Sequence, residues 1–273
     1  MSDDRPIGVF DSGIGGLTVV RELVDQLPGE SIVYFGDTAR VPYGPKSADT
    51  VRRYAREAAA FLLSRDVKMI VIACNTATAH AQASLSAHVD VPVIGVIEPG
   101  ARAAVEATRT CRVGVIGTAG TIASGAYDLA VRRKLPDARV YAQACPLFVP
   151  LVEEGWAHHP AAALIARAYL EPVRDMDVDV LILGCTHYPL LAPLVQEIMG
   201  PDVTLVDSAR ETAREVREVL EQRGMLRADG RPAQYAFIAS DAPARFREVG
   251  RRFLGDIVQS VERVDVEGYG RAA

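Results

Sequence analysis

Short runs of consecutive apolar residues alternate along the chain with longer stretches in which apolar residues recur every three or four positions. The short runs are rich in β-branched residues, which is typical of strands buried on both faces of a parallel sheet. The longer stretches predict amphipathic helices, such as 17–27 and 50–65, with Ser47 as the cap of the second. This alternation indicates βαβ units with right-handed crossovers. The predicted strands are 6–10, 31–35, 68–73, 91–97, 112–116, 139–142, 180–183, 203–206 and 235–239.

Three segments recur in the same order at nearly one spacing, which favours an internal duplication over chance similarity. The duplication predicts an α/β fold of two similar lobes with mainly parallel sheets, related by a pseudo-twofold axis and separated by a cleft. We expect 98–207 to form the second lobe, and 1–97 plus 208–273 to form the first. The recurring segments are 8–13 with 114–119, 67–76 with 178–187, and 96–104 with 206–213.

The composition narrows the class of protein. The chain has 273 residues, of which 49% are hydrophobic and 24% charged, so it can bury a core and is not disordered. Its net charge of −5 argues against direct binding of nucleic acid, which requires a basic face. No apolar run is long enough to span a membrane, and the acidic beginning of the chain does not resemble a signal segment. These features predict a soluble cytoplasmic protein.

The residues that follow the predicted strands are the candidates for chemistry, because open α/β sheets bind ligands outside the carboxyl ends of their strands. Cys74 follows strand 68–73, and Cys185 follows strand 180–183 at the equivalent place in the duplication. If the two lobes face each other, the thiols point into one cleft from opposite sides. Each thiol also precedes helical sequence, whose N-terminal field stabilises a thiolate. These helices are predicted over 76–86 and 190–199.

Two opposed acid/base groups suit the inversion of a carbon centre, which requires a proton to leave one face and another to arrive on the opposite face. Each group then needs a pKa near the working pH, and a thiol starts at about 8.5. Asp11 follows the first strand and can assist one thiol, whereas His187 is two residues from the other. The pattern therefore predicts two-thiol proton transfer.

Other interpretations of these residues compete with the chemical one. A single cysteine at a strand end is more often an inert small hydrophobe, so the argument rests on the repeated pair. Cys185 and His187 provide only two local zinc ligands, and no metal site is predicted. Cys111 and Cys145 lack a repeated partner and are interpreted as packing residues, and Trp156 is expected in the core.

Two turns rich in glycine and proline have open interpretations. Segment 11–16 (DSGIGG) opens a helix and can hold an anion through its N–H groups, but it matches neither nucleotide-binding glycine motif. Segment 41–47 (VPYGPKS) is a rigid turn that either holds a carboxylate or simply caps the next helix. No lysine stands at a duplicated strand end, which argues against pyridoxal phosphate. No cofactor is predicted.

Over nearly its whole length, the chain resembles the glutamate racemases of the cofactor-independent aspartate/glutamate racemase family. The most specific matches are the PYG segment, the CNTA motif and the GCTHYPLL motif. The matching segments are GVFDSGIGGLTV (8–19), FGDTARVPYGPKS (35–47), VIACNTATA (71–79), GVIGTAGTIASGAY (114–127), CPLFVPLVEEGW (145–156), LGCTHYPLL (183–191), DSARETA (207–213) and SDAPARFREVGRRFLG (240–255).

The resemblance implies that L- and D-glutamate are the substrates, that D-glutamate is supplied for peptidoglycan, and that the protein is a homodimer without metal or cofactor. It implies that Cys74 takes the α-proton of D-glutamate and Cys185 that of L-glutamate. Asp11, His187 and Glu153 match the assisting positions. The implied substrate contacts are Asp11, Ser12, Tyr43, Gly44, Asn75, Thr76, Thr118, Thr121, Thr186 and His187.

Three rival functions stay open at this point. The same site could racemise aspartate or a hydantoin, and the choice of glutamate rests on the match around Tyr43 and Gly44. A binding role, such as inhibition of a DNA topoisomerase, is compatible with the acidic charge through protein contact. A thiol hydrolase or redox protein would need only one attacking cysteine.

Overall fold

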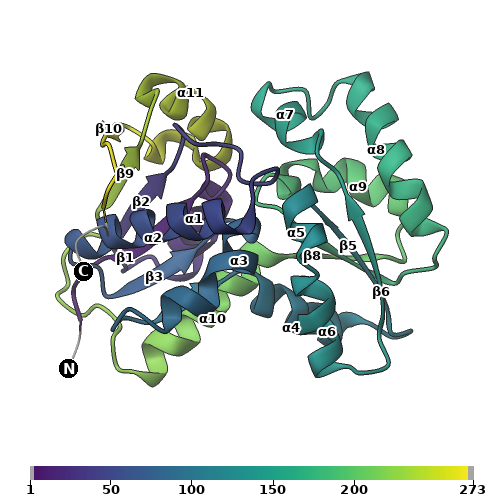
Figure 1. Ribbon diagram of the computed structural model, residues 1–273, viewed down its shortest axis with the longest axis horizontal. Helices are drawn as coiled ribbons and strands as arrows, with labels where there is room; N and C mark the ends of the chain where they lie inside the picture. Colours follow the sequence, from purple (N-terminus) through teal and green to yellow (C-terminus); the bar gives the residue numbers. More distant parts are fainter. Residues whose placement is uncertain (1–2, 270–273) are drawn as a thin grey trace.

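The computed structural model describes residues 3–269, which form two lobes lying side by side (Figure 1). Each lobe is built on its own sheet, and every strand pairing within these residues is parallel. Helices cover both faces of each sheet. The predicted two-lobed α/β fold is confirmed.

The two sheets share one topology. Within residues 3–269, the larger sheet has the strand order β10-β9-β2-β1-β3-β4 and the smaller has the order β6-β5-β7-β8. The order β2-β1-β3-β4 therefore matches β6-β5-β7-β8, as the predicted duplication requires. The strands are β1 (Ile7–Asp11), β2 (Ile32–Gly36), β3 (Met69–Ile72), β4 (Val93–Gly95), β5 (Arg112–Gly117), β6 (Arg139–Ala144), β7 (Val180–Gly184), β8 (Thr204–Asp207), β9 (Tyr235–Ala239) and β10 (Glu262–Arg263).

The helices follow the predicted alternation, with local differences at their ends. Ser47 caps its helix by accepting a hydrogen bond from the Thr50 N–H, as predicted. The helices are α1 (Leu17–Gln26), α2 (Ala48–Ser64), α3 (Asn75–Ser86), α4 (Ile97–Ala107), α5 (Ala119–Ala123), α6 (Ala126–Lys134), α7 (Phe148–Glu153), α8 (Pro160–Arg174), α9 (Ala192–Met199), α10 (Ser208–Gln222) and α11 (Pro243–Leu254). Short 3-10 turns cover Tyr188–Leu191 and Gly255–Ile257.

Three predictions are corrected by the structure. The strand predicted over 91–97 is shorter, because Ile97 already begins α4. The helix predicted over 190–199 begins as a 3-10 turn, and its regular part starts at Ala192. Trp156 is 48% exposed and stacks on His159, with ring centroids 4.3 Å apart, so its placement in the core was wrong.

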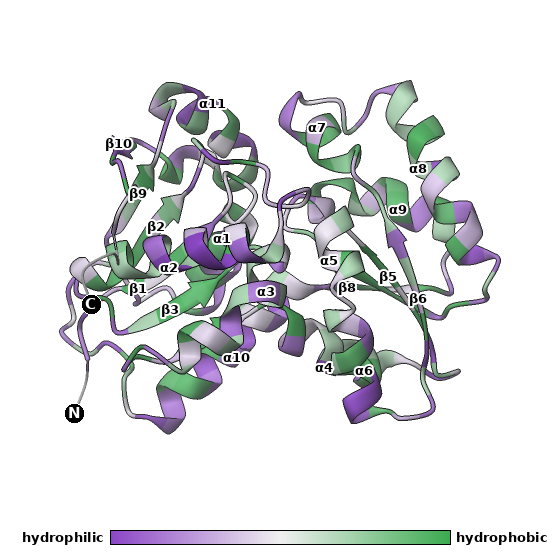
Figure 2. Ribbon diagram, viewed as in Figure 1, coloured by the Kyte–Doolittle hydropathy of each residue, from purple (hydrophilic) through white to green (hydrophobic). Residues whose placement is uncertain are grey.

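The chain after β8 returns to the first lobe, as predicted, because β9 and β10 join the larger sheet. The exact lobe boundaries at 97/98 and 207/208 stay a prediction. Figure 2 shows green, apolar strands at the centre of each lobe and helices striped green and purple, which is the amphipathic pattern that buries one helix face. Within residues 3–269, no helix is both long and apolar enough to cross a bilayer.

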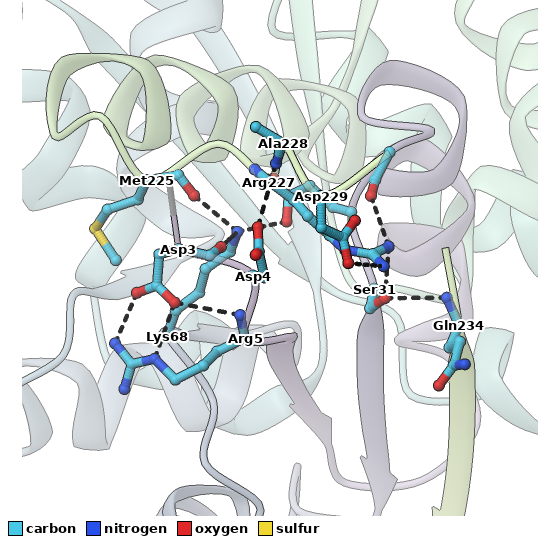
Figure 3. Close-up of polar contacts among 12 residues, drawn as sticks. Asp3, Asp4, Arg5, Ser31, Lys68, Met225, Arg227, Ala228, Asp229 and Gln234 are labelled. Atoms are coloured by element: carbon cyan, nitrogen blue, oxygen red, sulfur yellow. Dashed lines mark hydrogen bonds and ion pairs between the residues drawn. The ribbon is translucent and has the colours of Figure 1, made fainter. Parts of the chain in front are cut away.

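A buried lysine anchors the end of the first sheet opposite the thiol (Figure 3). Lys68 directly precedes β3 and is fully buried. Its Nζ lies 2.6 Å from a carboxylate oxygen of Glu30 and donates to the carbonyl oxygens of Asp3 and Met225 at 2.7 and 2.8 Å. This arrangement satisfies a buried charge and ties the two chain segments to the start of the strand that leads to Cys74.

Candidate active site

Cys74 lies at the carboxyl end of β3 and caps helix α3. Its Sγ accepts a hydrogen bond from the Ala77 N–H at 3.4 Å, and the residue is buried. Burial, with a smaller contribution from Asp11, raises the pKa of this thiol to about 12, and the Ala77 N–H and Ser12 hydroxyl only partly oppose the shift. Cys74 therefore holds its proton at neutral pH.

Cys185 follows β7 and has a different partner. Its Sγ is 3.9 Å from Nδ1 of His187, whose Nε2 is 2.9 Å from Oε1 of Glu153. Burial lowers the pKa of His187, but Cys185 and Glu153 outweigh burial and raise it to about 10. Burial likewise raises the pKa of Glu153, but the neighbouring His187 outweighs it, so that this pKa is lowered. Nε2 of His187 is thus placed to donate to the Glu153 carboxylate, and this contact favours the protonated imidazole.

The turn 11–16 connects the surroundings of the two thiols. A Cβ atom added at Gly15 would lie 2.4 Å from the His187 ring and from the Thr186 hydroxyl oxygen, and one added at Gly16 would lie 2.6 Å from Cβ of Asp11. Only glycine permits these approaches. The turn thus packs on the second-lobe residues after Cys185 and on Asp11 beside Cys74.

Three threonine hydroxyls meet where the lobes touch. Oγ1 of Thr76, from the first lobe, lies 2.9 Å from Oγ1 of Thr118 and 3.1 Å from Oγ1 of Thr121. Gly44 packs against Thr118, because a Cβ atom added at Gly44 would lie 3.0 Å from Cβ of Thr118. The hydroxyl donors predicted to contact substrate are therefore gathered from both lobes.

Two buried polar atoms at the site lack a hydrogen-bond partner within residues 3–269: Oδ1 of Asp11 and Nδ2 of Asn75. The second polar atom of each side chain does accept a hydrogen bond. Asp11 Oδ2 accepts from the Gly13 N–H at 2.9 Å, and Asn75 Oδ1 accepts from the Tyr127 hydroxyl at 2.7 Å. Because an unpaired buried polar atom is costly, these two atoms offer an acceptor and a donor to a polar ligand.

Tyr43 belongs to a buried polar network that sequence reasoning missed. Its hydroxyl donates to Asp37, which also accepts from Nε of Arg40 at 2.8 Å and from the Ser240 hydroxyl at 3.0 Å. The Tyr43 hydroxyl is thus occupied by this network, and its ring packs against the ring of Tyr54, with centroids 5.5 Å apart. Asp37 directly follows β2, so the rule that drew attention to Asp11 and Cys74 would also have found it.

The structure places the other predicted residues around the two thiols. Ser12 is close enough to Cys74 to influence its pKa, and the main-chain carbonyl of Thr186 accepts from the Thr18 hydroxyl at 3.0 Å across the lobes. Cys145 is buried, whereas Cys111 is only half-buried. Within the described residues, no group of three or more His, Cys, Asp or Glu side chains is arranged to hold a metal ion.

Comparison with known proteins identifies the class of protein. The sequence profile of the Asp/Glu/Hydantoin racemase family matches residues 7–216. The glutamate racemase of Geobacter metallireducens is 53% identical over 263 residues, which covers 96% of this chain and 97% of that protein. The chain belongs to the Asp/Glu/hydantoin racemase family, and the predicted resemblance is confirmed.

Solved structures place the chain more narrowly within this family. The crystal structure of glutamate racemase isoform RacE1 from Bacillus anthracis matches with a TM-score of 0.92 and 42% identity, covering 96% of this chain and 97% of that one. The structure of glutamate racemase from Francisella tularensis in complex with D-glutamate matches with a TM-score of 0.92 and 41% identity, covering 98% of this chain and 100% of that one. Both proteins are glutamate racemases by name.

Proposed function

We propose that this chain interconverts L- and D-glutamate by proton transfer between Cys74 and Cys185. The observation that carries the proposal is the equivalence of the two thiols, which follow β3 and β7 in two lobes of the same strand order. The turn 11–16 packs on residues beside both of them. The two thiols supply both proton-transfer steps, so the reaction as proposed needs no metal or cofactor.

The unlike partners of the thiols suggest how a turnover begins. Imidazolium His187 attracts negative charge on Cys185, whereas Cys74 keeps its proton. Cys185 as thiolate takes the α-proton of L-glutamate, and the Cys74 thiol gives its proton to the opposite face of the planar carbanion. D-glutamate leaves behind Cys185 as thiol and Cys74 as thiolate, which is the form that reacts with D-glutamate in the reverse direction.

The polar groups of the site suit the two ends of an amino acid. The unpaired Oδ1 of Asp11 can accept from the substrate ammonium, and Nδ2 of Asn75 can donate to the α-carboxylate. Hydroxyls of Thr76 and the two second-lobe threonines add donors that stabilise negative charge developing on that carboxylate. The main chain at Tyr43 and Gly44 is left for the side-chain carboxylate.

Glutamate is preferred over aspartate because relatives at about half identity are named glutamate racemases, and because a matching structure contains D-glutamate. A substrate panel tests this choice. We expect turnover of L- and D-glutamate and turnover at least about a hundredfold slower with aspartate, whose shorter chain leaves a charged end unpaired. Comparable rates with aspartate would refute the assignment.

Cys74→Ala and Cys185→Ala test the two-thiol mechanism. Each should abolish racemisation followed by polarimetry, whereas the half-buried Cys111→Ala serves as the matched thiol control and should remain active. In deuterated water, the product enantiomer should carry deuterium at the α-carbon, because the returning thiol has exchanged with solvent. Full turnover in either alanine variant, or product without solvent label, would refute the mechanism.

We also propose that the product D-glutamate is used for peptidoglycan in the cytoplasm. The support is the resemblance to bacterial relatives named glutamate racemase. Depletion of the protein in its host should arrest growth with lysis, and external D-glutamate should restore growth. Arrest that D-glutamate does not relieve would oppose this role.

The homodimer implied by the resemblance is retained as a proposal. The support is the resemblance, and five large hydrophobic residues exposed between positions 129 and 176 are the candidates for an interface on the second lobe. Light scattering coupled to size exclusion should give twice the chain mass. A monomer at micromolar concentration would contradict the proposal. The five residues are Leu129, Leu147, Trp156, Leu164 and Met176.

A further inference from the structure

Helix α11 of the first lobe lies opposite helix α7 of the second (Figure 1), and two of its side chains contact the end of α7. Nη1 of Arg252 donates to the main-chain carbonyl of Glu153 at 2.8 Å, and Nη2 of Arg245 lies 2.7 Å from Oε1 of Glu154. The two arginines are seven residues apart, so they lie on the same face of their helix. One helix of the first lobe thus contacts the segment that carries the carboxylate partner of His187.

The end of α7 is shaped to receive the Arg252 guanidinium. The last carbonyls of a helix lack intrahelical partners, and a cation placed there is favourable. Gly155 follows with a φ of +77°, and a Cβ there would lie 2.9 Å from Nη1 of Arg252. The missing side chain therefore lets the guanidinium lie against the turn that ends at Glu153.

The next residue of α11 contacts the imidazole itself. The ring of Phe253 meets the ring of His187 edge to face, with centroids 5.6 Å apart and planes at 89°. Phe253 is buried, whereas Arg252 is exposed. Consecutive residues of one helix thus touch the two members of the His187–Glu153 pair, one through its ring and the other through its main chain.

We propose that Arg252 is a positioning residue that acts on the second thiol through Glu153. Its hydrogen bond fixes the end of α7, and this keeps the Glu153 carboxylate on His187. The bond joins the two lobes, so it also ties their relative placement to the orientation of the imidazole. This inference rests on the proposed role of His187 beside Cys185.

Arg252→Met tests the inference, with Arg251→Met as the matched control. Arg251 is exposed on the same helix, and its only ion pair in residues 3–269 is with fully exposed Asp256 at 3.9 Å. We expect Arg252→Met to lower kcat/KM about ten- to a hundredfold, because small misplacement of a catalytic group is costly, and the control to leave it unchanged. Since the enantiomers are equally stable, kcat/KM must change equally in both directions.

A pH profile separates positioning from general loosening of the structure. The titratable and charged side chains facing the pair are those of Cys185, Asp11 and Arg245, and Glu153 itself helps to raise the pKa of His187. Loosening the pair lowers that pKa, so the alkaline limb of the kcat/KM profile should move to lower pH in Arg252→Met. Arg252→Lys keeps a donor and should recover part of the loss. A decrease in kcat/KM with an unmoved limb would overturn the inference.

A double-mutant cycle with Glu153→Gln decides whether Arg252 acts through Glu153. If it does, the double variant should be no slower than Glu153→Gln alone. The inference would be overturned if the two losses in kcat/KM multiplied in the double variant. It would also be overturned if Arg252→Met kept wild-type kcat/KM while Glu153→Gln was impaired. Either result would leave the two-thiol proposal intact. A fully active Glu153→Gln would instead remove the assisting role of Glu153 from the proposed function, and the inference with it.

Discussion

Replacing Gly15 with alanine should disable the second half of the site by a steric effect alone. Gly15 does not adopt a left-handed backbone, so alanine is compatible with its conformation. Its Cβ would lie 2.4 Å from the His187 ring and from Oγ1 of Thr186, whereas ordinary contacts are about 3.5–4.0 Å. His187, Thr186 or the turn must therefore move by about 1 Å or more, and a displacement of this size costs about a hundredfold in rate.

The assay compares kcat/KM for both enantiomers of glutamate with the free energy of unfolding in urea. Gly15→Ala should lose about a hundredfold in kcat/KM and about 1–3 kcal/mol in stability from overpacking. Gly29→Ala makes the same chemical change where a Cβ meets nothing within 4 Å, and it should retain wild-type activity. Wild-type kcat/KM in Gly15→Ala would show that the packing of this turn on His187 does not hold the imidazole in place.

Three other perturbations test the site and its support. Burial lowers the pKa of His187, but its partners raise it from 6.5 to about 10, so it contributes stability that is complete below pH 6.5 and is lost as pH rises through about 10. Tm should accordingly fall over this window, and His187→Asn should flatten the decline; an equally steep decline in the variant would contradict the assignment. Lys68→Met leaves buried Glu30 without its ion-pair partner and should lower the free energy of unfolding in urea by about 3–5 kcal/mol, with Glu30→Gln restoring part of the loss. A cost below about 1 kcal/mol would argue against a buried ion pair. Tyr127→Phe removes the donor to Asn75 Oδ1, so KM for glutamate should rise about tenfold, and an unchanged KM would mean that the hydroxyl does not orient this amide.

The strands could be predicted because their residues are buried on both faces and therefore form continuous apolar runs. The run at 235–239 coincides with β9, and the similar runs before Cys74 and Cys185 revealed the duplication that the strand orders confirm. Trp156 was misplaced for a related reason. Hydrophobicity alone does not say whether a large ring packs inside a lobe or stacks on the surface with His159.

The polar contacts between distant segments were not predictable in the same way. The Tyr127–Asn75 hydrogen bond joins residues 52 positions apart, and the Arg252–Glu153 bond joins residues 99 apart. No local pattern encodes such pairs, because each partner is an ordinary helix residue until the lobes are packed together.

The amino-acid sequence by itself determined the two α/β lobes, the thiols at equivalent strand ends and the polar residues beside them, because burial patterns and the positions that follow strands are local properties of the chain. Only the tertiary structure decided the balance at each thiol: burial outweighs the helix N-terminus and raises the pKa of Cys74, whereas Cys185 lies beside the His187–Glu153 pair. Desolvation and charge at a sulfur atom depend on every group packed around it in space, and those groups come from both lobes.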